Sequence, residues 1–372
     1  MLDSGKRIFL LSALLIVILL VGCGNPENSG KQENPEAYFS ADDFYQVEKI
    51  DAHVHYFSPK PAFMEQAVAD NFRLVTIDTY AGPDDLTVRE QENLALAQQE
   101  AFPGRIVNTT AFELEGWDDE GWLENQMSYV RESFGRGAVA LKVWKNIGME
   151  FKDHDGNFVM IDDPQFDPIF NYLRENGLTM VAHIGEPRNC WLPLEEMTVN
   201  NDREYFAENP QYHMFLHPEY PSYEEQVEAR DNMLRKHPGI KFVGCHLASL
   251  EWSLEKMAAF LEEFPEAGMD LAHRIGHLQY LALEDYEGVR EFFIKYQDRL
   301  IYGSDTLPDG SEDPDQFKSQ IHETWLRDWN YFATDEVMTS PYLDVEFRGL
   351  HLPREVVEKV FRENAESYYP GA

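Results

Sequence analysis

Short apolar segments alternate with longer amphipathic segments along most of this sequence, and this alternation restricts the fold more than any other feature. Segments with the length and composition of buried strands occur eight times, at residues 50–55, 74–79, 106–112, 138–143, 180–183, 242–246, 269–272 and 300–303. Segments with helical periodicity lie between them. Eight strand–helix repeats predict an α/β fold, a (β/α)8 TIM barrel. The alternative is an open doubly wound sheet with a separate small domain, but no glycine-rich dinucleotide loop follows the first strand.

Two longer segments interrupt the repeat after the fifth and the eighth strand. They cover residues 186–222 and 306–353, and a last helix is predicted near residues 354–368. Both segments follow the carboxyl end of a strand, which is the face where barrels carry their active sites. We therefore expect two loop insertions that act as lids or as walls of a substrate site, with surface elaboration as the alternative.

The sequence is strongly acidic, with 31 Lys and Arg against 67 Asp and Glu and a net charge of −36 over 372 residues. Such a surface repels the phosphates of nucleic acids and anionic lipid headgroups, which argues against nucleic-acid binding. The partner that we expect is a small-molecule substrate, and the oligomeric state stays open, a homo-oligomer included. Three cysteines in a chain of this length cannot form a disulfide framework.

The first 23 residues have the features of an export signal. Lys6 and Arg7 precede an apolar run, residues 8–22, that is too short for a comfortable membrane span. The sequence Leu-Val-Gly-Cys at residues 20–23 resembles the lipobox of bacterial lipoproteins. In that family the peptide is cut before the cysteine, here Cys23, and the thiol receives a diacylglycerol.

The lipoprotein resemblance divides the chain into three parts. Residues 1–22 are predicted to be the signal peptide, residues 23–48 the lipidated cysteine and a flexible tether, and residues 49–372 the barrel domain. The resemblance implies an exported protein in the bacterial cell envelope that contacts the membrane through its lipid anchor only. A plain secretory signal or an N-terminal anchor helix is the alternative.

Side chains suited to metal binding lie where the predicted strands end. His53 and His55 are two residues apart on the first strand, so the alternation of side chains points both to the same side. His183 ends the fifth strand, His246 ends the sixth, and Asp305 follows the eighth. Each alone is compatible with a buried polar residue of purely structural role. Together, at the end of a barrel that carries chemistry, they predict a divalent-metal site.

This combination resembles the amidohydrolase superfamily. The segments IDAHVH, VAHIGEP, FVGCHLAS and LIYGSDT are similar to the amidohydrolase-related branch that includes aminocarboxymuconate-semialdehyde decarboxylase. The resemblance implies that His53, His55, His183 and Asp305 bind a divalent metal, usually zinc. In members with one metal, which this sequence resembles more, the residue matching His246 stays free and acts as acid/base or polarises the substrate.

Members with two metals differ at the fourth strand. There the residue matching His246 binds the second ion, and a lysine carboxylated by CO2 bridges the pair; Lys142 is one candidate for this bridge. The alternative that we favour is an unmodified Lys142 or Lys145 paired with an acidic neighbour or a substrate carboxylate. One zinc ion per chain is therefore expected, with two as the alternative.

The expected chemistry follows from these groups. A zinc ion with an open position lowers the pKa of bound water to roughly 7. Asp305 is the candidate acceptor of the water's proton, and His246 is the candidate to polarise the carbonyl or to protonate the leaving group. The leading hypothesis is a metal-dependent hydrolase of a small amide, ester or lactone. The alternatives are a zinc-dependent non-oxidative decarboxylase of a small unsaturated or aromatic acid and a non-catalytic binding lipoprotein.

Three charged residues near strand ends are candidates for substrate binding. Arg188 and Arg274 follow the fifth and the seventh strand, and either could bind a substrate carboxylate. Pairing of each arginine with Asp or Glu is the alternative. Glu186 lies three residues beyond the fifth-strand histidine and is expected to support the metal ligands. Cys245 alternates outward on a regular strand, so we expect it in the core.

Overall fold

The computed structural model describes residues 37–80, 82, 86–308 and 310–372. The predictions of a signal peptide at residues 1–22 and of lipidation at Cys23 lie outside the described residues. Among the helices that are described, none combines the length and the apolar character needed to cross a membrane.

The described residues form a closed ring of parallel strands. The strands are β1 (Lys49–Val54), β2 (Phe72–Thr76), β3 (Ile106–Asn108), β4 (Thr110–Ala111), β5 (Ala140–Val143), β6 (Thr179–Ala182), β7 (Lys241–Gly244), β8 (Ala267–Asp270) and β9 (Leu300–Ile301). They pair in chain order, and Thr109, whose amide donates to the carbonyl of Thr76 at 2.9 Å, joins β3 and β4 into one barrel strand. The ring closes where the amide of Ala52 donates to the carbonyl of Tyr302 at 3.0 Å. The predicted (β/α)8 barrel is therefore confirmed.

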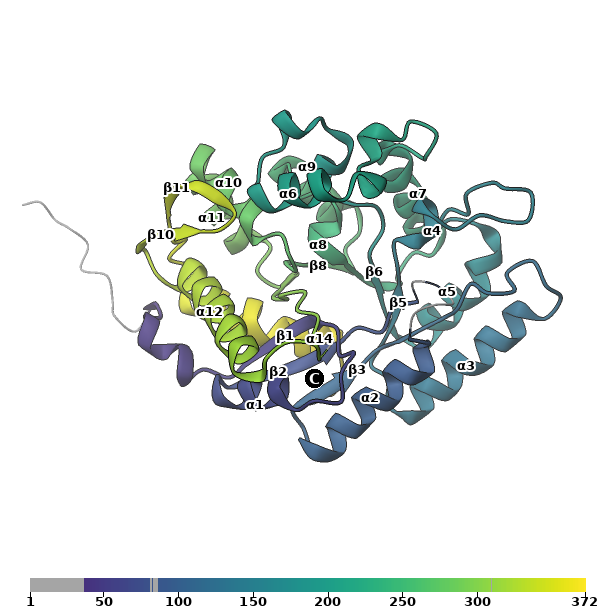
Figure 1. The fold of residues 1–372 in the computed structure, drawn as a ribbon, viewed down its shortest axis with the longest axis horizontal. Coiled ribbons are helices and arrows are strands. Elements are labelled where there is room, and N and C mark those ends of the chain that lie inside the picture. Colours follow the sequence, from purple (N-terminus) through teal and green to yellow (C-terminus); the bar gives the residue numbers. More distant parts are fainter. Residues whose placement is uncertain (1–36, 81, 83–85, 309) are drawn as a thin grey trace, which may run out of the picture. The chain divides into compact units, whose positions relative to one another are not determined.

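Helices cover the outside of this ring (Figure 1). The longer ones are α1 (Ala62–Ala69), α2 (Val88–Ala101), α3 (Trp122–Arg136), α5 (Asp167–Glu175), α6 (Asn200–Glu208), α7 (Tyr223–Lys236), α9 (Leu254–Glu263), α10 (Ile275–Glu284), α11 (Tyr286–Lys295) and α12 (Pro314–Ala333). The short ones are α4 (Asn146–Met149), α8 (Cys245–Ala248), α13 (Arg354–Glu358) and α14 (Asn364–Tyr368).

The remaining elements are single turns and one hairpin. The turns are η2 (Ala41–Tyr45), η3 (Pro164–Phe166), η4 (Arg188–Trp191), η5 (Leu194–Glu196), η6 (Pro210–Tyr212), η7 (Met214–Leu216) and the π-helical η8 (Lys359–Glu363). The strands β10 (Val337–Ser340) and β11 (Leu343–Arg348) pair antiparallel.

The inside of the ring is apolar and is closed at one end by the last residues of the chain. Side chains of β1, β2, β5, β6, β7 and β9 form one buried cluster that also contains Tyr368, Tyr369 and Ala372. The hydroxyl of Thr179, the first residue of β6, donates to the carbonyl of Tyr368. The chain end therefore covers the amino ends of the strands, and the carboxyl ends are left for the functional site.

A β-bulge in β1 decides which of its side chains face inward. Asp51 pairs with Leu74 whereas Val54 pairs with Thr76, so β1 contains one residue more than the facing stretch of β2. Before the bulge Asp51 faces outward, where its carboxylate accepts a hydrogen bond from the indole of Trp325 at 2.9 Å. Because the extra residue reverses the alternation, the histidines that follow face the inside of the barrel.

The segment 306–353 mostly belongs to the outer layer and differs from the expected insertion. Its long helix α12 packs against α1, and Trp325 stacks on Phe72 with ring centroids 4.2 Å apart. The hairpin β10–β11 follows. None of its described residues lines either of the two cavities at the site, which favours the alternative of surface elaboration for this segment, and a role as lid stays a prediction. The segment 186–222 does contribute α6 to the cavity wall.

Residues 37–48, which we expect in the tether, pack onto the barrel domain in this structure. Phe44 is fully buried and lies against Phe72 and Trp329, with ring centroids 6.2 Å apart in both pairs. The ammonium group of Lys49 lies 4.4 Å from the centre of the Phe44 ring. The packed domain therefore begins before residue 49.

Candidate metal centre and active site

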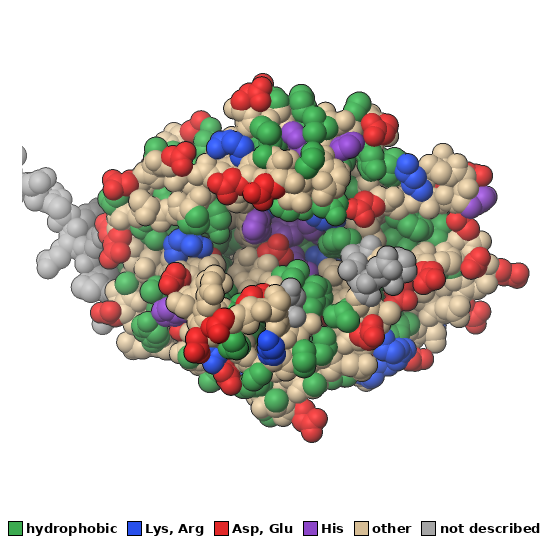
Figure 2. Space-filling view, in the orientation of Figure 1, with side chains coloured by type: hydrophobic (Ala, Val, Ile, Leu, Met, Phe, Trp, Pro, Cys, Tyr) green, Lys and Arg blue, Asp and Glu red, His purple; other side chains and the backbone are tan. Residues whose placement is uncertain are grey.

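Two histidines and one aspartate meet at the carboxyl ends of the strands. Asp305 Oδ1 lies 3.4 Å from His53 Nε2 and 3.2 Å from His55 Nε2. Ligand atoms of all three residues lie within 4.8 Å of one another. Figure 2 shows histidine side chains at the bottom of a hollow in the face viewed. The structure thus brings together three of the four side chains expected to bind metal.

The fourth expected ligand, His183, stands beside this cluster rather than in it. Its ring lies against that of His246, with centroids 4.1 Å apart, and its Nε2 is 3.8 Å from Glu186 Oε2. Glu186 in turn forms an ion pair with Lys145. Glu186 therefore contacts an expected ligand, and Lys145, not Lys142, has the acidic partner.

The Nδ1 atoms of His53 and His55 each lie at hydrogen-bond distance from an oxygen atom. His55 Nδ1 lies 2.8 Å from the carbonyl of Ile77, and His53 Nδ1 lies 2.8 Å from Asp270 Oδ2. A ring nitrogen that faces an oxygen acceptor carries the hydrogen, so in the neutral imidazole Nε2 has the free lone pair. The Nε2 atoms of His53 and His183 are buried without a hydrogen-bond partner in the part of the chain that the structure describes. Buried lone pairs beside a carboxylate fit the binding of a divalent cation.

The protonation states of these side chains also suit the binding of a metal ion. Burial raises the pKa of Asp305, but the neighbouring imidazoles of His55, His246 and His53 outweigh it and hold the pKa well below its usual value. Burial lowers the pKa of His183 to about 3 and also lowers that of His55. At neutral pH these groups are a carboxylate and neutral imidazoles, the forms that bind metal ions.

Asp270 was not predicted as a site residue, although it supports two of the histidines. One carboxylate oxygen contacts His53, and the other accepts the backbone N–H of His246 at 2.7 Å. Burial alone lowers the pKa of His53, but the charge of Asp270 outweighs it and raises the pKa to about 10, so His53 gives up a proton when it binds a metal ion. His183 was identified because it lies at the carboxyl end of a predicted strand. Asp270 and His273 lie at the end of the seventh barrel strand, so the same criterion would have identified them.

The backbone at the site takes conformations that ordinary residues avoid. Residues 246–249 are consecutively left-handed, with φ between 55° and 57°, and His273 and Asp305 have φ of 55° and 65°. Each such residue costs about 1–2 kcal/mol. Strain of this kind persists where the surrounding contacts fix a functional geometry. Here it turns His246 and Asp305 toward the cavity.

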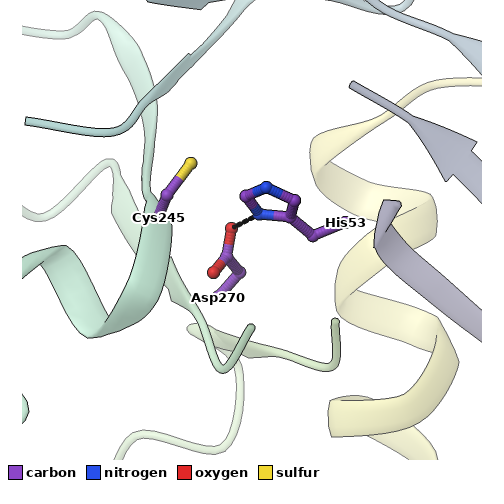
Figure 3. Close-up of side chains that lie close together, drawn as sticks. All are labelled: His53, Cys245 and Asp270. Carbon is purple, nitrogen blue, oxygen red and sulfur yellow. Dashed lines mark hydrogen bonds and ion pairs between the residues drawn. The ribbon is translucent and has the colours of Figure 1, made fainter. Parts of the chain in front are cut away.

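Cys245 faces the inside of the barrel, so the expectation that it alternates outward is wrong. Val243, two residues earlier, lies in the same buried cluster inside the ring, so the alternation of β7 itself points Cys245 inward, and the left-handed conformation that starts at His246 turns His246 inward as well. Figure 3 shows Cys245 beside His53 and Asp270, and ligand atoms of the three lie within 4.8 Å of one another. The ammonium group of Lys142 donates to Cys245 Sγ at 3.0 Å, below the metal ligands. A bridging role for Lys142 stays a prediction.

The two candidate arginines have different surroundings. Arg274 is 3% exposed, lines the cavity with His246 and Asp305, and has no carboxylate within ion-pair distance among the described residues. Arg188 pairs with Glu224 at 3.1 Å and lies 4.8 Å from the centre of the Trp252 ring, away from the cavities. Arg188 therefore corresponds to the alternative, an arginine paired with an acidic residue.

Comparison with known proteins concerns both the fold of this chain and the family to which it belongs. An uncharacterized TIM-barrel protein from Bordetella bronchiseptica aligns with a TM-score of 0.50 at 13% identity over 87% of this chain and 98% of its own, which shows a shared fold. 2,6-Dihydroxybenzoate decarboxylase from Rhizobium aligns at 0.48 and 14% identity over 86% and 98%. No curated protein matches the sequence. The sequence pattern of the family described as Amidohydrolase matches residues 50–371. The chain therefore belongs to the amidohydrolase family.

Proposed function

We propose that this chain is a metal-dependent hydrolase that cleaves a small amide, ester or lactone. The observation that carries the proposal is the approach of two imidazole Nε2 atoms to one oxygen of Asp305, at the carboxyl ends of the strands. The unpartnered Nε2 of His53 supports a cation at this point. Membership of the amidohydrolase family supports the same reading.

The residues that would hold the cation are His53, His55, His183 and Asp305, and zinc is the ion that we expect, one per chain. When bound, a divalent cation lowers the pKa of water and polarises a carbonyl group. The two-metal alternative, with His246 and a carboxylated Lys142 as further ligands, is decided by metal analysis.

The residues of the chain supply the proton transfers. Asp305 is a carboxylate at neutral pH and its side chain is 25% exposed, so it can accept the proton of the attacking water. His246 Nδ1 lies 2.8 Å from the carbonyl of Ala272 and carries the hydrogen there. Its Nε2 is then an acceptor, because burial holds the pKa of His246 well below the usual value. His246 must therefore take up a proton before it can protonate the leaving group.

Arg274 is proposed to bind an anionic group of the substrate. Replacing Arg274 with methionine is expected to raise KM for a carboxylate-bearing substrate by about 10- to 100-fold, because a hydrogen bond to a charged group contributes roughly 1.5–3 kcal/mol. Steady-state kinetics measure this effect, with kcat changing less. An uncharged ester of the same substrate is the control. Equal loss on both substrates would contradict a role in binding the anion.

The reaction itself is tested on a panel of amides, esters, lactones and unsaturated or aromatic acids with zinc-loaded protein. Release of amine, alcohol or ring-opened acid is expected. Release of CO2 without hydrolysis would replace the proposal with the decarboxylase alternative. Binding of panel members without any turnover would favour the non-catalytic alternative.

We also propose that the protein is exported and lipid-anchored, on the strength of the sequence around Cys23. Replacing Cys23 with serine is expected to abolish incorporation of radiolabelled palmitate and to release the protein from the membrane fraction, because the acceptor thiol is lost. Cys190→Ser is the matched control and should keep both properties, since Cys190 is a buried residue of the barrel domain. Unchanged labelling of the Cys23 variant would rule out lipidation there.

A further inference from the structure

A second cavity adjoins the histidine cavity and plays no part in the mechanism above. The histidine cavity measures about 450 Å3 and contains His183, His246 and Asp305 in its wall. The second cavity, here called the annex, measures about 470 Å3. Each volume by itself is within the range of small-molecule sites. A substrate confined to one small acyl group would leave the annex unused.

The two cavities are neighbours that share three wall residues. Lys145, Glu186 and Tyr205 line both of them. Glu186 Oε2 also lies 3.8 Å from His183 Nε2, so the annex begins directly beside the histidines. The annex therefore lies on the far side of the Lys145–Glu186 ion pair from the histidines, at the distance of a neighbouring subsite.

Aromatic and polar side chains share the wall of the annex, and the polar ones are Lys145, Glu150, Glu186 and Gln211. Its apolar members are Trp144, Met149, Tyr205, Tyr212, Met214 and Tyr220. The rings of Tyr205 and Tyr212 are nearly parallel, 5° apart in orientation, with centroids separated by 6.3 Å. Aromatic rings and thioethers bind the faces and edges of other rings favourably.

The charged members of the annex wall are the Lys145–Glu186 ion pair and Glu150, an exposed residue with no ion pair among the described residues. Lys145 is neutralised by its ion pair with Glu186. Tyr205 and Tyr212 are 43% and 42% exposed, so their rings face solvent until something covers them. Covering exposed aromatic surface with an apolar group is favourable, at about 25 cal/mol per Å2.

We propose that the annex binds a planar aromatic group of the substrate while the bond to be cleaved lies at the histidines. This inference rests on the proposed function and makes it more specific: the substrate is a two-part molecule, an aromatic group joined by a short linker to a hydrolysable carbonyl group.

The test uses the zinc-loaded full chain and two matched series of probes. Phenylacetate, 3-phenylpropanoate and 4-phenylbutanoate are compared with acetate, propanoate and butanoate by isothermal titration calorimetry. At least one phenyl acid is expected to bind about tenfold or more tightly than its alkyl counterpart, because the ring buries apolar surface. Equal affinities throughout both series would overturn the proposal.

Substitutions in the annex wall test whether the phenyl ring of the probe binds there. Tyr212→Ala and Trp144→Ala are expected to remove most of the preference for the phenyl acid and to leave the affinity for the alkyl acid unchanged. Phe215→Ala is the matched control, because Phe215 lies in the same segment, is 49% exposed and is not part of the annex wall. Equal loss in the control, or no loss in the two annex variants, would overturn the assignment. So would tighter binding of 4-(trimethylammonio)butanoate than of any phenyl acid, since the annex would then bind a cation.

Binding and turnover separate this inference from the proposed function. A protein that binds the phenyl acids through Tyr212 but hydrolyses nothing would overturn the hydrolase proposal and leave the aromatic site standing. A protein that hydrolyses small esters but shows no preference for the phenyl acids would overturn the aromatic site alone.

Discussion

Replacing Asp305 with asparagine is expected to lower kcat by about 10²- to 10⁴-fold while the barrel stays folded. The carboxylate is the proposed acceptor of the water's proton and one of the expected metal ligands, and the loss of such a group typically has this effect. The fold should tolerate the change because Asp305 has φ of 65°, a conformation that asparagine also adopts readily. Its backbone N–H donates to the carbonyl of His53 at 2.8 Å, and this bond is unaffected by the substitution.

The measurement is turnover on a verified substrate, with circular dichroism and thermal unfolding as controls for the fold. Asp344→Asn, at an exposed position of the hairpin, is a matched control that should keep full activity. Near-full turnover of the Asp305 variant would show that another group accepts the proton.

Loss of the metal is the second large effect that we expect. A His55→Ala/His183→Ala variant should fall from about one zinc ion per chain to far below one, because two of the four expected ligands are gone. His55 is a better choice than His53 for this purpose, since its Nδ1 contacts only a main-chain carbonyl. Removing His53 would leave the buried carboxylate of Asp270 without its partner and would destabilise the fold as well.

Elemental analysis measures the ion content, and His217→Ala, a histidine at the surface, is the control. Zinc should also raise the free energy of unfolding of the wild-type chain by about 2.7 kcal/mol when its concentration is 100 times Kd, and should not do so in the double variant. Two ions per chain in the wild type would favour the two-metal alternative and a role for Lys142. Unchanged zinc content in the double variant would contradict the ligand assignment.

The sequence predicts the barrel and the position of its reactive side chains because both depend on local pattern. Parallel strands that alternate with helices bring their carboxyl ends to one face, so His53, His55 and Asp305 meet although the aspartate is far from the histidines in the chain. His183 was expected among them, but a strand end fixes only the position of a backbone. The direction and reach of the side chain depend on its neighbours, here Glu186.

Contacts and local backbone changes that the sequence does not show account for the features that were missed. Cys245 was expected to point outward, but it lies in the inner cluster with Val243, and the left-handed conformation that begins at His246 turns His246 to the same side. Asp270 contacts His53 across 217 positions of the chain, and no local pattern reports such a contact. The helix α12 was taken for part of an insertion because the sequence does not show that Trp325 covers the outer face of β1.

The closure between β1 and the segment after β9 has a consequence for the order of folding. The two edges that meet there are separated by some 250 positions, as in the hydrogen bond from the amide of Ser304 to Asp51. Until that late segment is in place, the first strand has an unpaired edge, the kind of surface that promotes aggregation. Contacts of such long range also slow folding, because their loop entropy must be overcome first. Pairing of the last barrel strand therefore completes the fold, and Asp305, four residues after that strand, reaches the histidines of β1 only when this pairing has formed.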